Sequence, residues 1–401
     1  MELSHVHICL STLSVYRDLL DQPVLVALSK LSQALEAGDG LTAAQCYSQL
    51  FYEMQRSSSP SLGHWLYEAL RWSQGPYPTA MAKGDCPEHL EYAAMQDIDT
   101  LRAISAIPSQ QWLDAVAQAT PAQLRPLLSQ LLPWPDELPF SLSLYLAPLR
   151  QAYLQEGVGP LARHKAFVWE DGTLVPVPHP DCPTSEQLMG YEHHRNQVVQ
   201  NTRALLAGKY VNNVLLYGES GTGKSATVKH LLTLPGMEQL RLIEADKENL
   251  SGLPALIRSL EGQPLKFIIF IDDLTFDRDD PTYSVLKTIL EGGVERRPQN
   301  VAIYATSNRR HLVRQTISER AGDEMDRNET IREKTSLADR FGLRILYQGL
   351  SRGEFLDLVD LFAAQHGCTL PQEQLHQQAI AWERHHGSTT PRTALQFVLS
   401  L

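Results

Sequence analysis

The pattern of apolar residues divides the chain into regions of different character. Up to about residue 160, apolar side chains recur at positions i, i+3, i+4 and i+7, as in VLVALSKLSQALEAG and SLGHWLYEALRW. This spacing is typical of amphipathic helices. Proline and glycine separate the segments, for example at Ser59-Pro60 and Gly75-Pro76. We therefore predict an all-helical N-terminal domain over residues 1–160.

A short segment of different composition follows this domain. AFVW and TLVPV flank the dipeptide Asp171-Gly172, which suits the tight turn of a hairpin. The prolines that come next, in VPVPHP, indicate a linker. We expect residues 161–185 to form a hairpin and a linker between two domains.

Beyond residue 186, strands alternate with helices. The segments NNVLLYG, LRLIEAD, FIIFIDD, VAIYATSN and LRILYQGL have strand character, and GKSATVKHLL, LSGLPALIRSLEG and YSVLKTILEGG have helical character. Several of the strands are continuous apolar runs, which indicates a parallel sheet covered on both faces. Only helical segments remain after Gly353. The pattern predicts an α/β core over residues 186–350 and a helical subdomain over residues 351–401.

Charge and cysteine content narrow the class of protein. Residues 1–150 carry 15 acidic and 8 basic side chains, and residues 151–401 carry 31 and 27. The first region is therefore a poor surface for nucleic acid, and contact by the second is neither supported nor excluded. Five cysteines without a CxxC pair, and an opening segment without a basic n-region, predict a cytoplasmic protein. The chain has no run of 18 apolar residues, so we expect no membrane span.

The stretch LLYGESGTGKSATVKHLL fits the pattern GxxxxGK[ST] between a strand and a helix. Glycines allow successive backbone N–H groups to converge on phosphate oxygens, and the helix that follows adds the positive end of its dipole. We predict that this loop binds a nucleotide, with the lysine on the β- and γ-phosphates and the serine on Mg²⁺. The expected binding residues are Gly218, Glu219, Ser220, Gly221, Thr222, Gly223, Lys224, Ser225 and Ala226.

Two carboxylates end the apolar strand FIIFIDD, which begins about 40 residues after the loop. The strand would carry Asp272 and Asp273 to the carboxyl edge of the sheet, where such folds bind their ligands. Carboxylates at the end of a buried run are costly unless a cation is near. We assign Asp272 to Mg²⁺ and Asp273 to polarising the attacking water. The alternative is that both residues only cap the turn that follows.

In this order the motifs resemble those of the AAA+ ATPases, and more narrowly an uncharacterised bacterial AAA+ ATP-binding family of unknown function. The narrower resemblance covers about residues 160–401 and rests on LMGYEHHRNQVVQNTRALLAG, NNVLLYGESGTGKSATVKHL, FIIFIDDLTF, ATSNRRHL, SLADRFGL and TTPRTALQFV. It implies a P-loop NTPase fold of the AAA+ type, a parallel α/β sheet with a C-terminal helical subdomain. It also implies ATP and Mg²⁺ as ligands.

The resemblance implies roles for residues outside the loop. Gly190 and Tyr191 would lie near the adenine, although an ordinary turn at a helix start is the simpler alternative. Asn308 would hold the hydrolytic water or the γ-phosphate, and asparagine at a strand end is otherwise a common turn former.

Two arginines also match AAA+ positions. Arg340, in ADRFG, matches the arginine finger that one subunit of an oligomer supplies to its neighbour, with Arg344 as a substitute. The alternative for Arg340 is a surface ion pair with Asp339 or another nearby acid. Arg392, at the start of the last helix, matches the arginine that contacts the γ-phosphate from the C-terminal subdomain.

One departure from the AAA+ pattern affects the expected rate. Asp273 stands where most AAA+ ATPases have glutamate, and its carboxylate reaches one methylene less far, so hydrolysis is expected to be slow. The motifs predict an ATPase that remodels or loads an unidentified macromolecular partner, for which we expect a protein client. A nucleotide-gated scaffold that resembles helicase loaders and a P-loop small-molecule kinase remain as alternatives.

The pairs His193-His194 and His385-His386 are expected to be solvated rather than metal-bound, because neighbours in sequence do not face each other on a helix.

Overall fold

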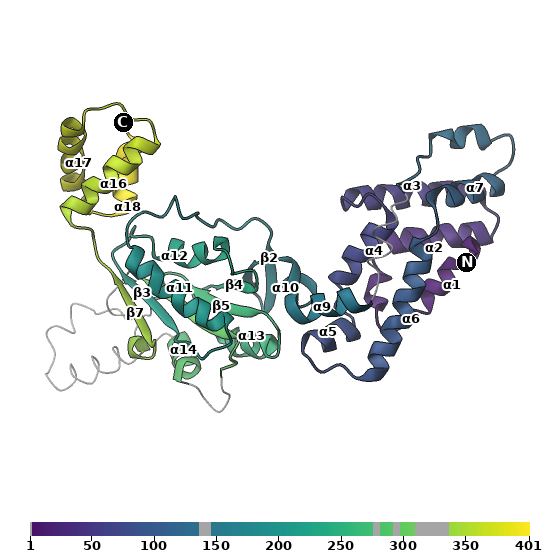
Figure 1. Cartoon of the computed structure of the whole chain (residues 1–401), viewed down its shortest axis with the longest axis horizontal. Coiled ribbons are helices and arrows are strands. Elements are labelled where there is room, and N and C mark those ends of the chain that lie inside the picture. The colour runs from purple at the N-terminus through teal and green to yellow at the C-terminus, as the bar shows by residue number, and fades with distance from the viewer. Residues whose placement is uncertain (1, 136–145, 276–280, 292–296, 309–336) are drawn as a thin grey trace. The chain divides into compact units, whose positions relative to one another are not determined.

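The computed structural model describes residues 2–135, 146–275, 281–291, 297–308 and 337–401. The chain divides into two compact units (Figure 1). The first contains Met1–Arg163 with Gly262–Pro264, and the second contains His164–Glu261 with Leu265–Leu401. None of the helices in the described ranges combines the length and the hydropathy that a membrane span requires.

The described part of the first unit is helical, as its apolar spacing predicts. Leu28 and Leu31 on one helix and Tyr47 and Leu50 on the next are almost completely buried, so each helix turns one apolar face to a shared core. The helices are α1 (Val6–Ser11), α2 (Pro23–Glu36), α3 (Gly40–Arg56), α4 (Leu62–Arg71), α5 (Pro76–Ala82), α6 (Glu88–Ser105), α7 (Ser109–Ala119), α9 (Leu146–Glu156) and α10 (Gly159–Arg163), with short 3₁₀ turns at Leu3–His5, Arg17–Leu19 and Arg125–Gln130.

The second unit is built on a seven-stranded sheet with the order β2-β1-β4-β5-β6-β3-β7. Its neighbouring strands are parallel except for the antiparallel pair β1 and β2. The central strands β5 and β6 are buried almost throughout, which agrees with their continuous apolar sequences. The strands are β1 (Ala166–Glu170), β2 (Thr173–Val177), β3 (Val214–Gly218), β4 (Leu240–Ala245), β5 (Lys266–Ile271), β6 (Val301–Ser307) and β7 (Leu343–Tyr347).

Helices connect these strands and follow the last of them. After β7, three helices pack around a core of their own that includes Phe355, Phe362 and Phe397 (Figure 1). The helices of the second unit are α11 (Glu192–Leu206), α12 (Lys224–His230), α13 (Leu253–Leu260), α14 (Pro281–Glu291), α16 (Arg352–Gln365), α17 (Gln372–His386) and α18 (Pro391–Leu399), with 3₁₀ turns at Leu231–Thr233 and Lys247–Gly252.

The hairpin formed by β1 and β2 belongs to the sheet and does not stand apart as a connector. β1 pairs in parallel with β4, with Phe167 opposite Ile243. Phe167 and Trp169 are buried, so this pairing removes two aromatic side chains from water. Pro176 lies on the outer strand β2, where a missing N–H breaks no bond to a further strand. Residues 161–185 therefore contain the expected hairpin, and its two strands are also part of the sheet.

The strand order places β3, which precedes the glycine-rich loop, between β6 and β7. The carboxyl ends of β3, β5 and β6 consequently meet at one edge of the sheet, and the C-terminal helices follow β7. The predicted architecture is confirmed: a mainly parallel α/β sheet with a C-terminal helical subdomain, preceded by a helical region.

Candidate functional site

The loop between β3 and α12 contains three glycines with positive φ, a backbone conformation that residues with a side chain rarely adopt. The φ angles of Gly218, Gly221 and Gly223 are 134°, 80° and 88°. A side chain on Gly218 would meet the carbonyl oxygen of Tyr347 at 2.0 Å, whereas a side chain on Gly223 would enter open space. The N–H of Glu219 donates to that same oxygen at 2.9 Å. The start of the loop is thus anchored on β7, and its end is open to a ligand.

Lys224 is folded back on this loop. Its Nζ donates to the carbonyl oxygens of Gly218 and Glu219 at 3.2 and 2.6 Å and to Oδ1 of Asn308 at 2.9 Å. The residue is only 5% exposed. Burial lowers the pKa of Lys224, and the nearby carboxylates at the end of β5 act in the opposite direction. The structure therefore brings the lysine of the loop and the asparagine at the end of β6 into direct contact.

Asp272 faces the first turn of α12. Oδ1 of Asp272 accepts hydrogen bonds from Ser225 Oγ at 2.6 Å and from Thr306 Oγ1. The N–H of Asp273 also approaches this oxygen, at 3.2 Å. The printed sequence places Ser225 and Asp272 far apart, and their contact follows from the neighbouring carboxyl ends of the strands. No donor among the described residues reaches Oδ2 of Asp272 within hydrogen-bond distance.

Asp273 has a left-handed backbone conformation, with φ of 47°. Its exposed carboxylate accepts a hydrogen bond from Asn308 Nδ2 at 2.9 Å. Asn308 therefore lies between Lys224 and Asp273 and contacts both. The N–H group of Leu274 in the turn donates to a carbonyl of β6, so the carboxylate of Asp273 does not cap it.

Arg392 lies against the tip of the loop. Its backbone N–H donates to the carbonyl oxygen of Gly221 at 3.3 Å. A side chain on Gly221 would come within 3.0 Å of Arg392 and of Thr390, the residue that caps α18. The Arg392 side chain is exposed, and no carboxylate in the described ranges forms an ion pair with it. The C-terminal helices thus bring an unpaired cation to the loop.

Gly190 and Tyr191 begin α11 beside these elements, with φ angles of 73° and 53°. The Tyr191 ring lies 5.0 Å from that of Tyr347, and its hydroxyl donates to the carbonyl of Gln348. His194 packs against both tyrosine rings, at 5.5 and 5.2 Å. These aromatic residues form a continuous group next to the anchor of the loop.

The expectation of solvated histidines is wrong for His194. It is half-buried, and burial together with the charge of His193 lowers the pKa of its ring. Adjacent residues on a helix point in different directions, so His194 packs against the aromatic group while His193 is exposed to solvent. The sequence does not indicate which of the two is buried. His385 and His386 are exposed as expected. No group of three metal-binding side chains occurs among the residues that the structure describes.

Among the described residues, no hydrogen bond or ion pair joins Arg340 to the glycine-rich loop of the same chain. Its guanidinium is half-exposed and pairs with Glu291 at the end of α14, with an Nη2 to Oε1 distance of 2.9 Å. Arg344 pairs with Asp339 at 2.6 Å. The partner of Arg340 is therefore a nearby acid other than Asp339.

Thr306 is the main residue of the site that sequence patterns did not single out. It stands two residues before Asn308 in VAIYATSN, so a threonine near the end of a mostly apolar strand was the available signal. Tyr347, which anchors the loop, gave no signal, because its role depends on a backbone carbonyl.

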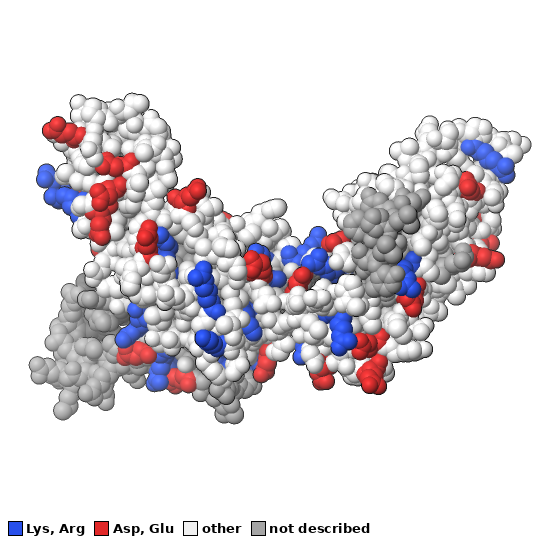
Figure 2. Space-filling view, in the orientation of Figure 1, with Lys and Arg blue, Asp and Glu red and all other residues white. Residues whose placement is uncertain are grey.

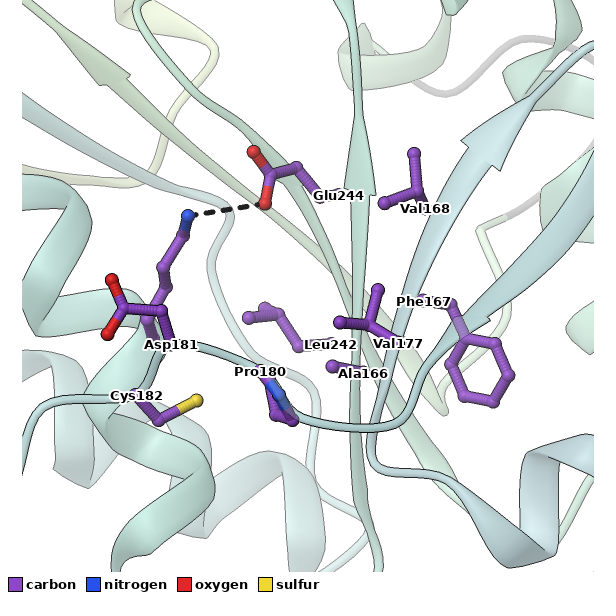
Figure 3. Close-up of a pocket in the computed structure, with 10 residues that line it drawn as sticks. Ala166, Phe167, Val168, Val177, Pro180, Asp181, Cys182, Leu242 and Glu244 are labelled. Carbon is purple, nitrogen blue, oxygen red and sulfur yellow. Dashed lines mark ion pairs between the residues drawn. The ribbon is translucent and has the colours of Figure 1, made fainter.

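A cavity of about 200 Å³ lies away from the loop, between the β1–β2 hairpin, β4 and α12 (Figure 3). Ala166, Val177 and Leu242 provide apolar walls, and Lys229 Nζ pairs with Glu244 Oε2 at 3.4 Å. None of its lining residues belongs to the loop or to the carboxylate pair.

Comparison with known proteins gives one family and a set of distant structures. The family described as "Protein of unknown function (DUF815)" matches residues 162–401. The curated proteins contain no match. The solved structures include the RuvB Holliday junction branch migration motor of Thermotoga maritima, with 15% identity over 54% of this chain and 63% of that chain and a TM-score of 0.36. A single-residue mutant of the same motor has 15% identity over 54% and 64%, with a TM-score of 0.37.

The chain thus spans less than two thirds of the length of these RuvB structures. The family match includes the glycine-rich loop, both carboxylates and Arg392, and it agrees with the range of about 160–401 over which the motifs show their resemblance. Because this match covers more than half of the sequence, the chain belongs to the DUF815 family.

Proposed function

We propose that this protein binds ATP with Mg²⁺ at the glycine-rich loop and hydrolyses it to remodel or load a protein partner. One observation carries the proposal. Three separate segments contribute polar side chains around a single loop of the P-loop pattern. Asn308 is bonded to both Lys224 and Asp273, and Ser225 of the first helical turn is bonded to Asp272. A structural core has no use for a buried lysine and two carboxylates at one sheet edge, whereas a bound nucleoside triphosphate uses them all.

The lysine illustrates why a phosphate fits. Lys224 is buried with carbonyl and amide oxygens as its bonding partners, and burial disfavours its charged form. An anionic phosphate in the loop would compensate the buried charge much better than neutral carbonyls do. In this proposal Lys224 turns toward the β- and γ-phosphates, and backbone N–H groups of the loop after Glu219 surround the phosphate oxygens. Arg392 would add a second cation from the C-terminal helices.

The donor set suits Mg²⁺. Ser225 Oγ and the Asp272 carboxylate are hard oxygen donors in contact with each other, the kind of ligand that Mg²⁺ prefers beside a phosphate. These two residues would hold the ion, which when bound would neutralise charge on the phosphates. Asp273 and Asn308 would orient the water that attacks the γ-phosphate. Gly190 and Tyr191 would lie beside the base.

A nucleotide-gated scaffold with little hydrolysis is the second candidate. The observation that favours it is the Asp273 side chain, which is shorter than glutamate and is bonded to Asn308 at 2.9 Å. A base that is held by a neighbour and reaches less far would polarise water poorly. The two candidates share the nucleotide site and differ in turnover.

Arg340 is proposed to act as an arginine finger in a homo-oligomer. Its ion pair with Glu291 is half-exposed, with side chains 46% and 34% exposed. Pairs of this kind contribute about 0–1 kcal/mol to stability, so a phosphate of a neighbouring subunit could replace the carboxylate at small cost.

For the client we favour a protein, because Figure 2 shows Lys and Arg interspersed with Asp and Glu on the visible face rather than a basic surface that would attract nucleic acid.

The test compares wild type with Lys224→Ala. ATP and Mg²⁺ should raise the thermal midpoint of the wild type and leave that of the variant unchanged. Free phosphate should be the product, whereas a kinase would transfer it to an added metabolite. An equal ATP-induced shift in both proteins would refute the site. Affinity capture with Asp273→Asn in the presence of ATP should then retain the client, and binding of duplex or single-stranded DNA instead would contradict a protein client.

A further inference from the structure

The Thr306 hydroxyl lies at the centre of the carboxylate pair. The residue is on β6 and is 2% exposed. Its Oγ1 donates to Oδ1 of Asp272 and accepts the N–H of Asp273, at 2.9 Å from that nitrogen. Its carbonyl oxygen accepts the N–H of Leu274 at 2.7 Å. One residue thus holds three consecutive residues of the segment that follows β5.

The backbone of this segment needs such support. Asp273 has φ of 47°, a conformation that residues with a side chain rarely adopt and that persists where surrounding bonds fix it. The two peptide groups that flank the Cα of Asp273 both donate to Thr306, through the N–H of Asp273 and the N–H of Leu274. Without the hydroxyl, the first of these would keep only a 3.2 Å approach to Asp272.

The same hydroxyl determines which oxygen of Asp272 is available. Oδ1 receives donors from Ser225 and Thr306, while Oδ2 has no donor within the described part of the chain. Two hydrogen bonds to the same oxygen fix the rotation of the carboxylate. The bonds therefore leave one oxygen of an oriented carboxylate for another ligand.

We propose that Thr306 is a positioning residue for both carboxylates. Through its hydroxyl it orients Asp272 toward a divalent cation, and it holds Asp273 in the left-handed conformation from which its side chain reaches Asn308. The inference rests on the proposed function, because the cation is the one expected beside the nucleotide. Loss of residues that orient metal ligands commonly costs about 10- to 100-fold in metal affinity or activity.

The test uses three variants of the full chain. Thr306→Val keeps the shape and removes the hydroxyl, and Thr306→Ser keeps the hydroxyl. Thr202→Val is the matched control, because Thr202 is a fully buried threonine whose hydroxyl bonds to Tyr304 OH and Val198 O, away from the carboxylates. Mn²⁺ serves as the probe ion, and its binding in the presence of ADP is followed by the loss of the free-ion signal in electron paramagnetic resonance.

Thr306→Val should weaken Mn²⁺ binding about 10- to 100-fold and lower the turnover of ATP at saturating Mg²⁺. Its affinity for ADP in the presence of a chelator should stay within about threefold, because the loop itself is unchanged. Thr306→Ser and Thr202→Val should both bind Mn²⁺ within about threefold of wild type.

Wild-type Mn²⁺ affinity in Thr306→Val would overturn the inference. It would also be overturned if Thr306→Ser bound Mn²⁺ as weakly as Thr306→Val, because the methyl group and not the hydroxyl would then determine Mn²⁺ affinity. If Thr306→Val fails to fold, Thr306→Cys takes its place and must bind Mn²⁺ more weakly than Thr306→Ser, since S–H is a weaker donor. A wild type that binds Mn²⁺ with ADP but does not hydrolyse ATP would refute the ATPase proposal alone, and the Mn²⁺ titration would still test Thr306.

Discussion

Gly223 and Gly236 in the second unit have similar backbone conformations, but only Gly223 lies in the glycine-rich loop. Comparing alanine variants of the two separates the loss of folding stability that a side chain causes from its effect on ATP binding. Gly223 in the loop has φ of 88°, and Gly236 in the turn before β4 has φ of 80°. No atom lies within 4 Å of the position that an added Cβ would occupy at either glycine. Alanine at each site should therefore pay the same conformational cost, about 1–2 kcal/mol, reduced by about 0.4–1 kcal/mol because alanine also restricts the unfolded chain.

Nucleotide should distinguish the two variants. If ATP is supplied at about 100 times its dissociation constant, binding stabilises the folded state by about 2.7 kcal/mol. For a unit of this size, that energy corresponds to a rise of about 5–10 °C in the thermal midpoint. Gly236→Ala should show the full rise. Gly223→Ala should show little, because its Cβ would occupy the space beside the backbone N–H groups that the phosphates are proposed to approach.

The assay is thermal unfolding of wild type, Gly223→Ala and Gly236→Ala, each with and without ATP and Mg²⁺. Without nucleotide, the two variants should unfold at midpoints within about 2 °C of each other, which establishes that they are matched. An ATP-induced rise in Gly223→Ala equal to that in Gly236→Ala would refute the assignment of the open side of the loop to phosphate. A rise in neither variant would contradict the use of Gly236 as a control and would point to a wider loss of structure.

Three further predictions test other parts of the site. Arg340→Ala should reduce hydrolysis by about 10³-fold or more and leave ATP affinity within a few-fold, whereas Arg344→Ala should change hydrolysis little; a large loss of ATP affinity in Arg340→Ala would place that arginine in its own subunit's site. Burial lowers the pKa of His194 in the folded state below its ordinary 6.5, so the unfolded chain binds the proton more tightly and stability should fall as the pH drops below about 6.5. His194→Phe should flatten this dependence in urea titrations between pH 5 and 8, and an unchanged slope would exclude His194 as its source. Asp273→Glu should raise turnover if the short side chain limits the rate, and an unchanged rate would remove the basis for slow hydrolysis.

The parts of the site that sequence predicts are those that depend on local spacing. Gly218 through Ser225 form a loop because their order alone requires a left-handed turn followed by a helix start. Asp272 reaches the same edge because any parallel strand of this topology ends there, so its contact with Ser225 follows from the fold class.

The features that sequence did not predict depend on contacts between distant segments. The hydroxyl of Thr306 reaches Asp272 because β6 lies beside β5. The sequence of neither strand indicates that this hydroxyl faces this carboxylate. The pairing of Arg340 with Glu291 depends on how α14 ends relative to β7. The place of the β1–β2 hairpin in the sheet was also not predicted, because its pairing with β4 leaves no local mark in the sequence.

Hydrogen bonds within the chain also connect the C-terminal helices to the end of β7 and to the glycine-rich loop. Leu350, in the segment that joins β7 to α16, exchanges two hydrogen bonds with Thr389, in the segment that enters α18, at 2.9 and 2.6 Å. A few residues later, the N–H of Arg392 reaches the carbonyl of Gly221. Because Gly221 lies at the tip of the glycine-rich loop, a phosphate bound there as proposed would act on the start of α18 through this bond. The length of the bond between Arg392 N and Gly221 O, with and without nucleotide, would report this coupling.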